Sequence, residues 1–415
     1  MKLAIGAVAA LLALPLLTTP AVAAAAAENC LTEPATLTVE EQRLDKELPG
    51  YGKFGPTLLD QAGYRKRVDN TTSLLCRMPN LRAAEILLNN AGDDLFQQAV
   101  DESQDQGKLD DRPLYWSRLT LTRAIRQWHP RFALSAQDRA GLITDFDRAA
   151  RGFESVEFTA KPGVRRVLVS GFDPFTLDRD IRIGNPSGAS ALQLDGREFD
   201  TPQGRVVVQA VLLPVLWGAF DEGIVEAAYG PRLQDPKRRP DTIVTISQGR
   251  PEQFDIEKWA GGGRGGFPDN DNVSSKGLVP PAAGWPQPGD NFILTTLPYE
   301  QMQAAGTGPY PVKFNTAFCE QPKGATAPVC HEDGTPLPDS TPIQGGGGDY
   351  LSNESMYRAN RLRLGLGLTG VHGGHLHTPV LGVPAPGLPT DAGFEKRRAD
   401  IAAQTVALVT AAGRN

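Results

Sequence analysis

One stretch of the chain places a serine where its hydroxyl could act as a nucleophile. Residues 345–363 read GGGGDYLSNESMYRANRLR, a glycine loop that leads into a helical pattern. Met356, Ala359 and Leu362 recur at the spacing of one helical face. Serine is a preferred N-cap residue, so Ser352 is predicted to begin this helix, where unpaired backbone N–H groups can stabilise an oxyanion. The alternative is that Ser352 only caps the helix, the commoner role of such a serine.

Histidines that could act as general bases or metal ligands cluster in the segment VHGGHLHTPV. His375 and His377 alternate along a predicted strand, so their imidazoles point to the same face and could share a metal ion. No nearby Asp, Glu or Cys completes a ligand pattern. We therefore predict no metal site, and we expect polar or packing roles for His372 and His375.

The elements that must position these residues alternate between strand and helix from Lys161 onward. Continuous apolar runs of strand length suit a parallel sheet that is buried on both faces. These runs are Arg165–Ser170, Arg205–Leu213 and Asp241–Ser247, and the predicted helices are Ser187–Leu194, Ala219–Ala228 and Phe394–Ala412. The alternation predicts an α/β fold with a central, mostly parallel sheet and flanking helices. Sites in this class form at the carboxyl ends of strands, which makes the loop Gly171–Ile183 a site candidate.

Residues 28–160 carry a different pattern, in which apolar residues recur every three to four positions. The predicted helices are Leu81–Val100, Arg112–Trp128 and Ser135–Phe153. The sequence therefore predicts a small, mainly helical N-terminal region of unknown role, followed by an α/β domain over residues 161–415.

The first 27 residues have the layout of a secretory signal peptide. Lys2 precedes an apolar run over residues 3–17, and small residues follow at positions 21–23. No later stretch is apolar over the length of a membrane span. The mature protein is therefore expected to be secreted through a Sec-type pathway, without membrane insertion.

The chain contains four cysteines, an even number that favours disulfides in an oxidising compartment. Three connectivities are possible. The predicted one pairs neighbours in the sequence, Cys30 with Cys76 and Cys319 with Cys330, so that each bridge staples one loop.

The charge balance of the chain argues against polyanionic partners. The 415 residues include 42 Lys and Arg against 48 Asp and Glu, which gives a formal net charge of −6. No basic patch is expected, and we predict that nucleic acid is not a partner.

Several motifs in the α/β region resemble those of pyroglutamyl peptidase I, also called pyrrolidone-carboxylate peptidase. The first strand and its loop, Val167–Phe175 and Asn185–Ser187, resemble the family's VLVTGFxPFGG and its NPS or NPT. Shorter matches continue in family order at Leu213–Val215, Ile256–Lys258, Pro268–Asn270, Thr296–Pro298, Gly346–Asn353 and Leu376–Leu381. The resemblance covers residues 164–381 and nothing before Lys161.

The resemblance implies a catalytic triad. Glu257 matches the family's acid and His377 its histidine, while Ser352 falls where the family has a nucleophilic cysteine. A serine hydroxyl is less acidic than a thiol and must lose its proton as it attacks, so it needs a well-aligned histidine. The resemblance therefore implies a Ser-His-Glu hydrolase. The alternative is an inactive member that keeps the binding pocket.

The resemblance also implies a substrate. Phe172 and Phe175 match the aromatic residues that line the family's pyroglutamyl site, and Gln248, which follows a strand end, is carried over as a further substrate-binding residue. We expect removal of N-terminal pyroglutamyl groups from peptides, with no cofactor. The insertion over residues 314–343 is expected to act as a lid or to narrow the leaving-group side of the site.

Overall fold

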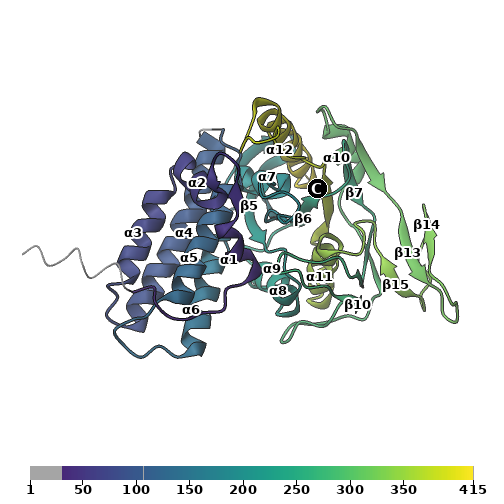
Figure 1. Cartoon of the computed structure of the whole chain (residues 1–415). Helices are drawn as coiled ribbons and strands as arrows, with labels where there is room; N and C mark the ends of the chain where they lie inside the picture. Colours follow the sequence, from purple (N-terminus) through teal and green to yellow (C-terminus); the bar gives the residue numbers. More distant parts are fainter. Residues whose placement is uncertain (1–29, 106, 415) are drawn as a thin grey trace, which may run out of the picture.

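The computed structural model describes residues 30–105 and 107–414, so the predicted signal peptide lies outside the described residues. A helical region, formed by the first part of the chain, packs beside a region in which helices cover a sheet (Figure 1). The predicted fold class, α/β preceded by a mainly helical region, is confirmed.

A seven-stranded sheet forms the centre of the second region, in the order β12-β7-β16-β6-β3-β5-β4. Its strands are β3 Val164–Phe172, β4 Glu198–Thr201, β5 Gly204–Leu213, β6 Thr242–Gln248, β7 Phe254–Glu257, β12 Val312–Asn315 and β16 His372–Thr378. Four of the six pairings are parallel, and β7 with β16 and β4 with β5 are the antiparallel ones. The sheet is therefore mostly parallel, as the continuous apolar runs predicted.

Helices cover both faces of this sheet. Val167 and Val169 of β3 pack in one apolar cluster with α7 and α12, whereas Leu168 between them packs in another with α9 and α11. This alternation is the geometry of a strand buried on both sides. The helices are α7 Pro186–Leu194, α8 Trp217–Asp221, α9 Ile224–Gln234, α10 Tyr299–Ala305, α11 Leu351–Gly365 and α12 Ala392–Ala412.

One helix prediction in this region was wrong. The helix predicted over Ala219–Ala228 is two helices, α8 and α9. They are separated at Gly223, whose φ of 81° lies in the left-handed region that favours glycine and cannot continue a right-handed helix.

The N-terminal region is a bundle of helices with one short hairpin. Its elements are α1 Val39–Gln42, the 3₁₀ helix η1 Arg43–Asp45, β1 Glu47–Leu48, β2 Gly52–Lys53, α2 Phe54–Ala62, α3 Arg65–Leu75, α4 Leu81–Asp105, α5 Arg112–Gln127 and α6 Ala136–Ala149. Ser135 caps α6, because its side chain accepts a hydrogen bond from the backbone N–H of Asp138. The apolar side chains of the bundle belong to the same cluster as Val167, α7 and α12, so the two regions share a core.

Three small sheets complete the fold. They pair β8 Trp259–Gly261 with β11 Phe292–Leu294, pair β9 Gly263–Gly265 with β10 Lys276–Leu278, and join β13 Phe318–Gln321 to β14 Val329–His331 and β15 Thr341–Gln344. The third sheet falls in the predicted insertion.

Both predicted disulfides are confirmed. Cys30 is bonded to Cys76, and Cys319 to Cys330, which are direct partners across β13 and β14. Bridges of this kind are typical of extracellular or periplasmic proteins. Within residues 30–105 and 107–414, no helix combines the length and apolar character needed to cross a membrane.

Glu40 of α1 is a buried carboxyl group at the junction of the two regions. Its Oε1 accepts hydrogen bonds from Tyr115 Oη at 2.8 Å and from Asn270 Nδ2 at 2.9 Å. Burial, followed by repulsion from Asp173, raises its pKa to about 7, although Arg118 opposes the shift and Asp271 adds to it. The folded protein therefore keeps a proton on Glu40 that the unfolded chain loses at lower pH.

This shift predicts a pH dependence of stability. A raised folded-state pKa contributes stability that is fully present below the unfolded value near 4.5 and is lost as the pH rises through about 7. Glu40→Gln should therefore be more stable relative to the wild type at pH 8 than at pH 5, by about 1–3 kcal/mol. Chemical denaturation of both proteins at the two pH values measures the difference. An equal difference at pH 5 and pH 8 would show that Glu40 does not titrate in this way.

Candidate active site

A buried carboxylate and an imidazole are joined near the end of the central strands. His377 Nδ1 lies 2.7 Å from Glu257 Oε1, and both side chains are almost fully buried. The sheet brings them together because β16 lies between β6 and the antiparallel β7. In the tautomer in which Nδ1–H donates this hydrogen bond to the carboxylate, Nε2 is left as an acceptor, which is what a general base requires.

Asn315 holds the carboxylate from the other side. Its Nδ2 donates to Glu257 Oε2 at 2.7 Å and to the carbonyl oxygen of Gly346 at 2.9 Å. Asn315 lies opposite Glu257 in the parallel pairing of β12 with β7. Both oxygens of Glu257 are thus engaged, and its strand is tied to the glycine loop. Asn315 was not predicted as a site residue, because a single asparagine at the end of a four-residue strand carries no motif.

Ser352 lies in the first turn of α11, so the helix start predicted there is confirmed, although Ser352 is not the N-cap. The N-cap is Tyr350, and Leu351 is the first helical residue. Leu351 is 1% exposed, so the buried face of the helix begins before the serine rather than at Met356. The Ser352 hydroxyl instead donates a hydrogen bond backward, to the carbonyl oxygen of Gly347 at 3.1 Å.

Gly347 brings the serine and the histidine to the same place. A Cβ added at Gly347 would lie 3.1 Å from His377 Cε1, so the glycine loop runs directly against the imidazole that faces the start of α11. In the part of the chain that the structure describes, no hydrogen bond joins Ser352 to His377. Hydrogen bonds between a nucleophile and its base are often absent without substrate and form in the complex. Release of Ser352 from Gly347 needs rotation about one side-chain bond.

The start of α11 supplies donors beside the serine. The N–H groups of the first helical turn, including those of Ser352 and Asn353, have no acceptor within the helix, and the helix dipole makes this end positive. Asn353 fixes this turn, because its Oδ1 accepts from the Gly261 N–H at 2.9 Å and its Nδ2 donates to the Gly261 carbonyl at 2.7 Å. A rigid helix N-terminus next to a hydroxyl suits stabilisation of an oxyanion.

A small pocket opens beside Ser352. It is lined by Phe172, Phe175, Asn185, Val215, Ser247, Gln248, Tyr350, Leu351 and Ser352. Four predicted site residues therefore line one pocket, whereas His377 and Glu257 are not among its lining residues. Asn185, Ser247 and Tyr350 were not predicted as lining residues, because they reach the pocket from separate loops and strands.

Gln248 presents a fixed amide at this pocket. Its Oε1 accepts a hydrogen bond from the Leu381 N–H at 3.0 Å. This contact orients the side chain so that its NH₂ group remains as the donor end of the amide. A carbonyl group of a ligand is the natural partner for such a donor.

The two phenylalanines differ in their surroundings. Phe172 is 3% exposed and stacks on Phe220 with a centroid distance of 6.2 Å, so it serves the core as well as the pocket. Phe175 is only partly buried and lies in the loop after β3. The Phe175 side chain is therefore the freer of the two to adjust to a ligand.

The other histidines are engaged separately. His375 is fully buried, with Nδ1 2.7 Å from Thr245 Oγ1 and Nε2 2.8 Å from Ser247 Oγ. Burial, with a smaller contribution from His377, holds the pKa of His375 well below its usual value, so the ring is neutral. His372 Nδ1 lies 2.9 Å from the Thr296 carbonyl oxygen. Among the described residues, no group of three or more His, Cys, Asp and Glu side chains is placed to hold a metal ion.

The insertion over residues 314–343, which was predicted to act as a lid, does not line the pocket. The sheet of β13, β14 and β15 packs against β8 and β9, and within the described chain none of its residues lines the pocket. Its contribution to the site comes from the preceding strand, through Asn315. Whether it moves during binding stays a prediction.

Comparisons with known proteins match most of the chain to two domain families. Residues 22–147 match the PA0049 N-terminal domain, and residues 166–287 and 280–382 match the PA0049 C-terminal domain. The chain is also 32% identical to the uncharacterized protein PA0049 of Pseudomonas aeruginosa, over 91% of this chain and 89% of that protein.

These matches correct the family assignment made from the sequence. The matching families are those of the two PA0049 domains, and neither indicates a pyroglutamyl peptidase family, so the assignment to pyroglutamyl peptidase I was wrong. The motifs behind it are short and rich in Gly, Pro and Asn. Such residues serve the geometry of strand ends and turns in many α/β proteins, so the motifs do not by themselves define a family.

Proposed function

The chain belongs to the family of the PA0049 N-terminal and C-terminal domains, and we propose that it is a hydrolase that transfers acyl groups through Ser352. The observation that carries the proposal is the buried pair of His377 and Glu257, 2.7 Å apart, beside a serine in the first turn of a helix. Gly347 accepts the hydrogen bond of the serine and lies so close to His377 that a side chain at this position would meet the imidazole.

In the proposed reaction Ser352 Oγ attacks the acyl carbon while His377 Nε2 takes its proton. Glu257 holds the ring through Nδ1 and stabilises the imidazolium ion. The carbonyl oxygen gains negative charge, which the N–H groups of the first turn of α11 stabilise. His377 then gives the proton to the leaving group. Water cleaves the acyl-serine ester by the same route in reverse.

The pocket favours a small acyl group with its own amide. Phe175 offers an aromatic wall and Gln248 a donor for a carbonyl oxygen. A five-membered lactam has this shape and polarity, so the proposed substrates are peptides with an N-terminal pyroglutamyl group. This substrate rests on the pocket alone, since the family match gives it no support.

We also propose that the protein is exported. The disulfides are typical of an oxidising compartment, where an exposed thiolate would be oxidised and a serine hydroxyl would not. A serine nucleophile is therefore the appropriate one for a secreted enzyme.

One observation favours a second candidate, a binding protein without activity. The Ser352 hydroxyl is hydrogen-bonded to Gly347 and not to His377. If that arrangement persists with ligand bound, the pocket binds an acyl group without cleaving it.

A labelling experiment separates the two. A fluorophosphonate probe should modify Ser352 of the folded protein, because only a serine activated by a base attacks phosphorus at a useful rate. Mass spectrometry locates the label, and release of a fluorophore from a pyroglutamyl amide measures turnover. Turnover should survive iodoacetamide, since the four cysteines are in disulfides. Absence of both label and turnover would favour the binding protein, and loss of turnover on alkylation would exclude Ser352 as the nucleophile.

A further inference from the structure

Two loops lie beside the pocket, and both are contacted by the N-terminal region. The first follows β3 and carries Phe175. The second contains Pro268, whose carbonyl oxygen accepts a hydrogen bond from Tyr350 Oη at 3.1 Å. Phe175 and Tyr350 both line the pocket, so one loop supplies a lining residue and the other is hydrogen-bonded to one.

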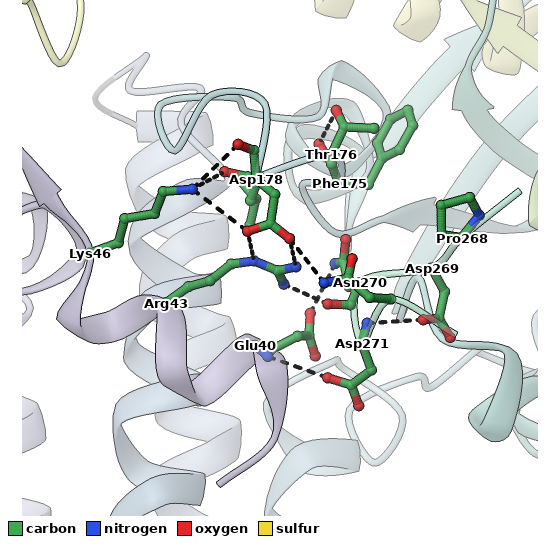
Figure 2. Close-up of polar contacts among 12 residues, drawn as sticks. Glu40, Arg43, Lys46, Phe175, Thr176, Asp178, Pro268, Asp269, Asn270 and Asp271 are labelled. Atoms are coloured by element: carbon green, nitrogen blue, oxygen red, sulfur yellow. Dashed lines mark hydrogen bonds and ion pairs between the residues drawn. The ribbon is translucent and has the colours of Figure 1, made fainter. Parts of the chain in front are cut away.

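Arg43 of η1 bridges these two loops (Figure 2). Its guanidinium forms a forked ion pair with Asp178 of the first loop, with Nε–Oδ1 at 3.0 Å and Nη2–Oδ2 at 2.6 Å. The remaining nitrogen, Nη1, donates to the carbonyl oxygen of Asn270 in the second loop at 2.5 Å. Arg43 is 5% exposed, and charge-assisted hydrogen bonds of this kind are strong and directional.

Asn270 completes the bridge from the second loop. Its Nδ2 donates to the carbonyl oxygen of Pro174 at 2.9 Å, directly before Phe175, and to Glu40 Oε1 at 2.9 Å. Glu40 in turn donates its backbone N–H to Asp271 Oδ1 at 3.3 Å (Figure 2). The segment 40–43 thus contacts both loops through side chains and backbone.

The backbone beside Phe175 needs such support. Thr176 has φ of 59°, in the left-handed region that a β-branched residue rarely adopts. This conformation is unfavourable by itself and persists only where surrounding contacts hold it. Asp178, two residues further on, forms the ion pair with Arg43.

We propose that the segment of α1 and η1 positions the acyl pocket and that Arg43 is a specificity-determining positioning residue, which holds Phe175 and the Pro268 loop at the spacing that the acyl group requires. The helical region then completes the binding site of the α/β region. The change expected in KM rests on the proposed function, whereas the change expected in hydrogen–deuterium exchange does not.

Arg43→Ala in the full chain tests the inference. Loss of the bridge should raise KM for the pyroglutamyl amide by about tenfold and leave kcat within about threefold, because the serine and histidine are untouched. Hydrogen–deuterium exchange should become faster at residues 174–184 and 267–273. Arg43→Lys should recover only part of the affinity, since an ammonium group cannot form the fork.

Arg67→Ala is the matched control. Arg67 also donates to an acid and to an amide, Asp94 Oδ2 at 2.9 Å and Gln98 Oε1 at 2.8 Å, but both partners lie in α4 of the helical region. Arg67→Ala should change neither KM for the pyroglutamyl amide nor hydrogen–deuterium exchange in the two loops. Unchanged loop exchange in Arg43→Ala, or an equal effect of Arg67→Ala, would overturn the inference. A wild type that turns over no substrate would overturn the proposed function, and the exchange result would still decide this inference.

Discussion

Ser352→Ala should lower kcat on the pyroglutamyl amide by at least about a thousandfold, because no other group can form the acyl intermediate. His377→Ala should cause a similar loss, and the double variant should lose little more than either one, since the two residues act as a unit. Initial rates with saturating substrate measure the effect, and binding of the uncleaved amide to Ser352→Ala shows that the pocket is intact.

Ser355→Ala is the control for this experiment. Ser355 lies in the same helix, and its hydroxyl donates to the Ser352 carbonyl oxygen at 2.7 Å. It is buried away from the pocket, so its loss should leave kcat within about threefold of the wild type. An active parent whose rate is unchanged by Ser352→Ala would place the chemistry elsewhere.

Ser352→Cys separates a working serine site from a site built for a thiol. A site tuned for serine relies on the alignment of His377 and Glu257, so the cysteine variant should be no faster than the parent. A nearly inactive parent that gains turnover from the cysteine would indicate the inactive alternative, because a thiol needs less help to ionise.

Local patterns were enough to predict the main elements. The apolar runs at β3, β5 and β6 are buried on both faces, so consecutive residues in each run are apolar and the strand can be predicted from them. The helix predicted from Ser135 begins there because Ser135 caps it through a contact with a residue only three positions away, which is a local feature. The break at Gly223 was missed, since the apolar periodicity continues across it and only its backbone angle ends the helix.

The site was predictable only in part, for the same physical reason. Ser352 and His377 lie in segments of unusual composition, so their residue types draw attention to them. Asn315 and Arg43 act through partners that are 58 and 135 positions away, and no local pattern records such contacts. Residues that position a site from another element therefore become visible only in the folded chain.

Asp173→Ala should lower the free energy of unfolding by about 3–5 kcal/mol, because it leaves buried positive charge without its partner. Asp173 is 2% exposed and accepts from Arg118 at 3.1 and 2.8 Å and from Arg151 at 2.8 Å. Both arginines belong to the helical region or its end and are almost fully buried, so this contact joins the two regions. Chemical denaturation of the oxidised protein measures the loss.

Asp200→Ala is the matched control for Asp173→Ala, since it also removes an aspartate paired with an arginine. Asp200 Oδ1 lies 3.2 Å from Arg205 Nε, but the side chains are 86% and 50% exposed. Water replaces the partner of an exposed charge, so the cost should stay below about 1 kcal/mol. If Asp173→Ala cost as little, Asp147, which also pairs with Arg118 and Arg151 at 2.9 and 2.6 Å, would suffice to neutralise both arginines. The contact between the two regions would then depend on their shared apolar core rather than on this ion pair.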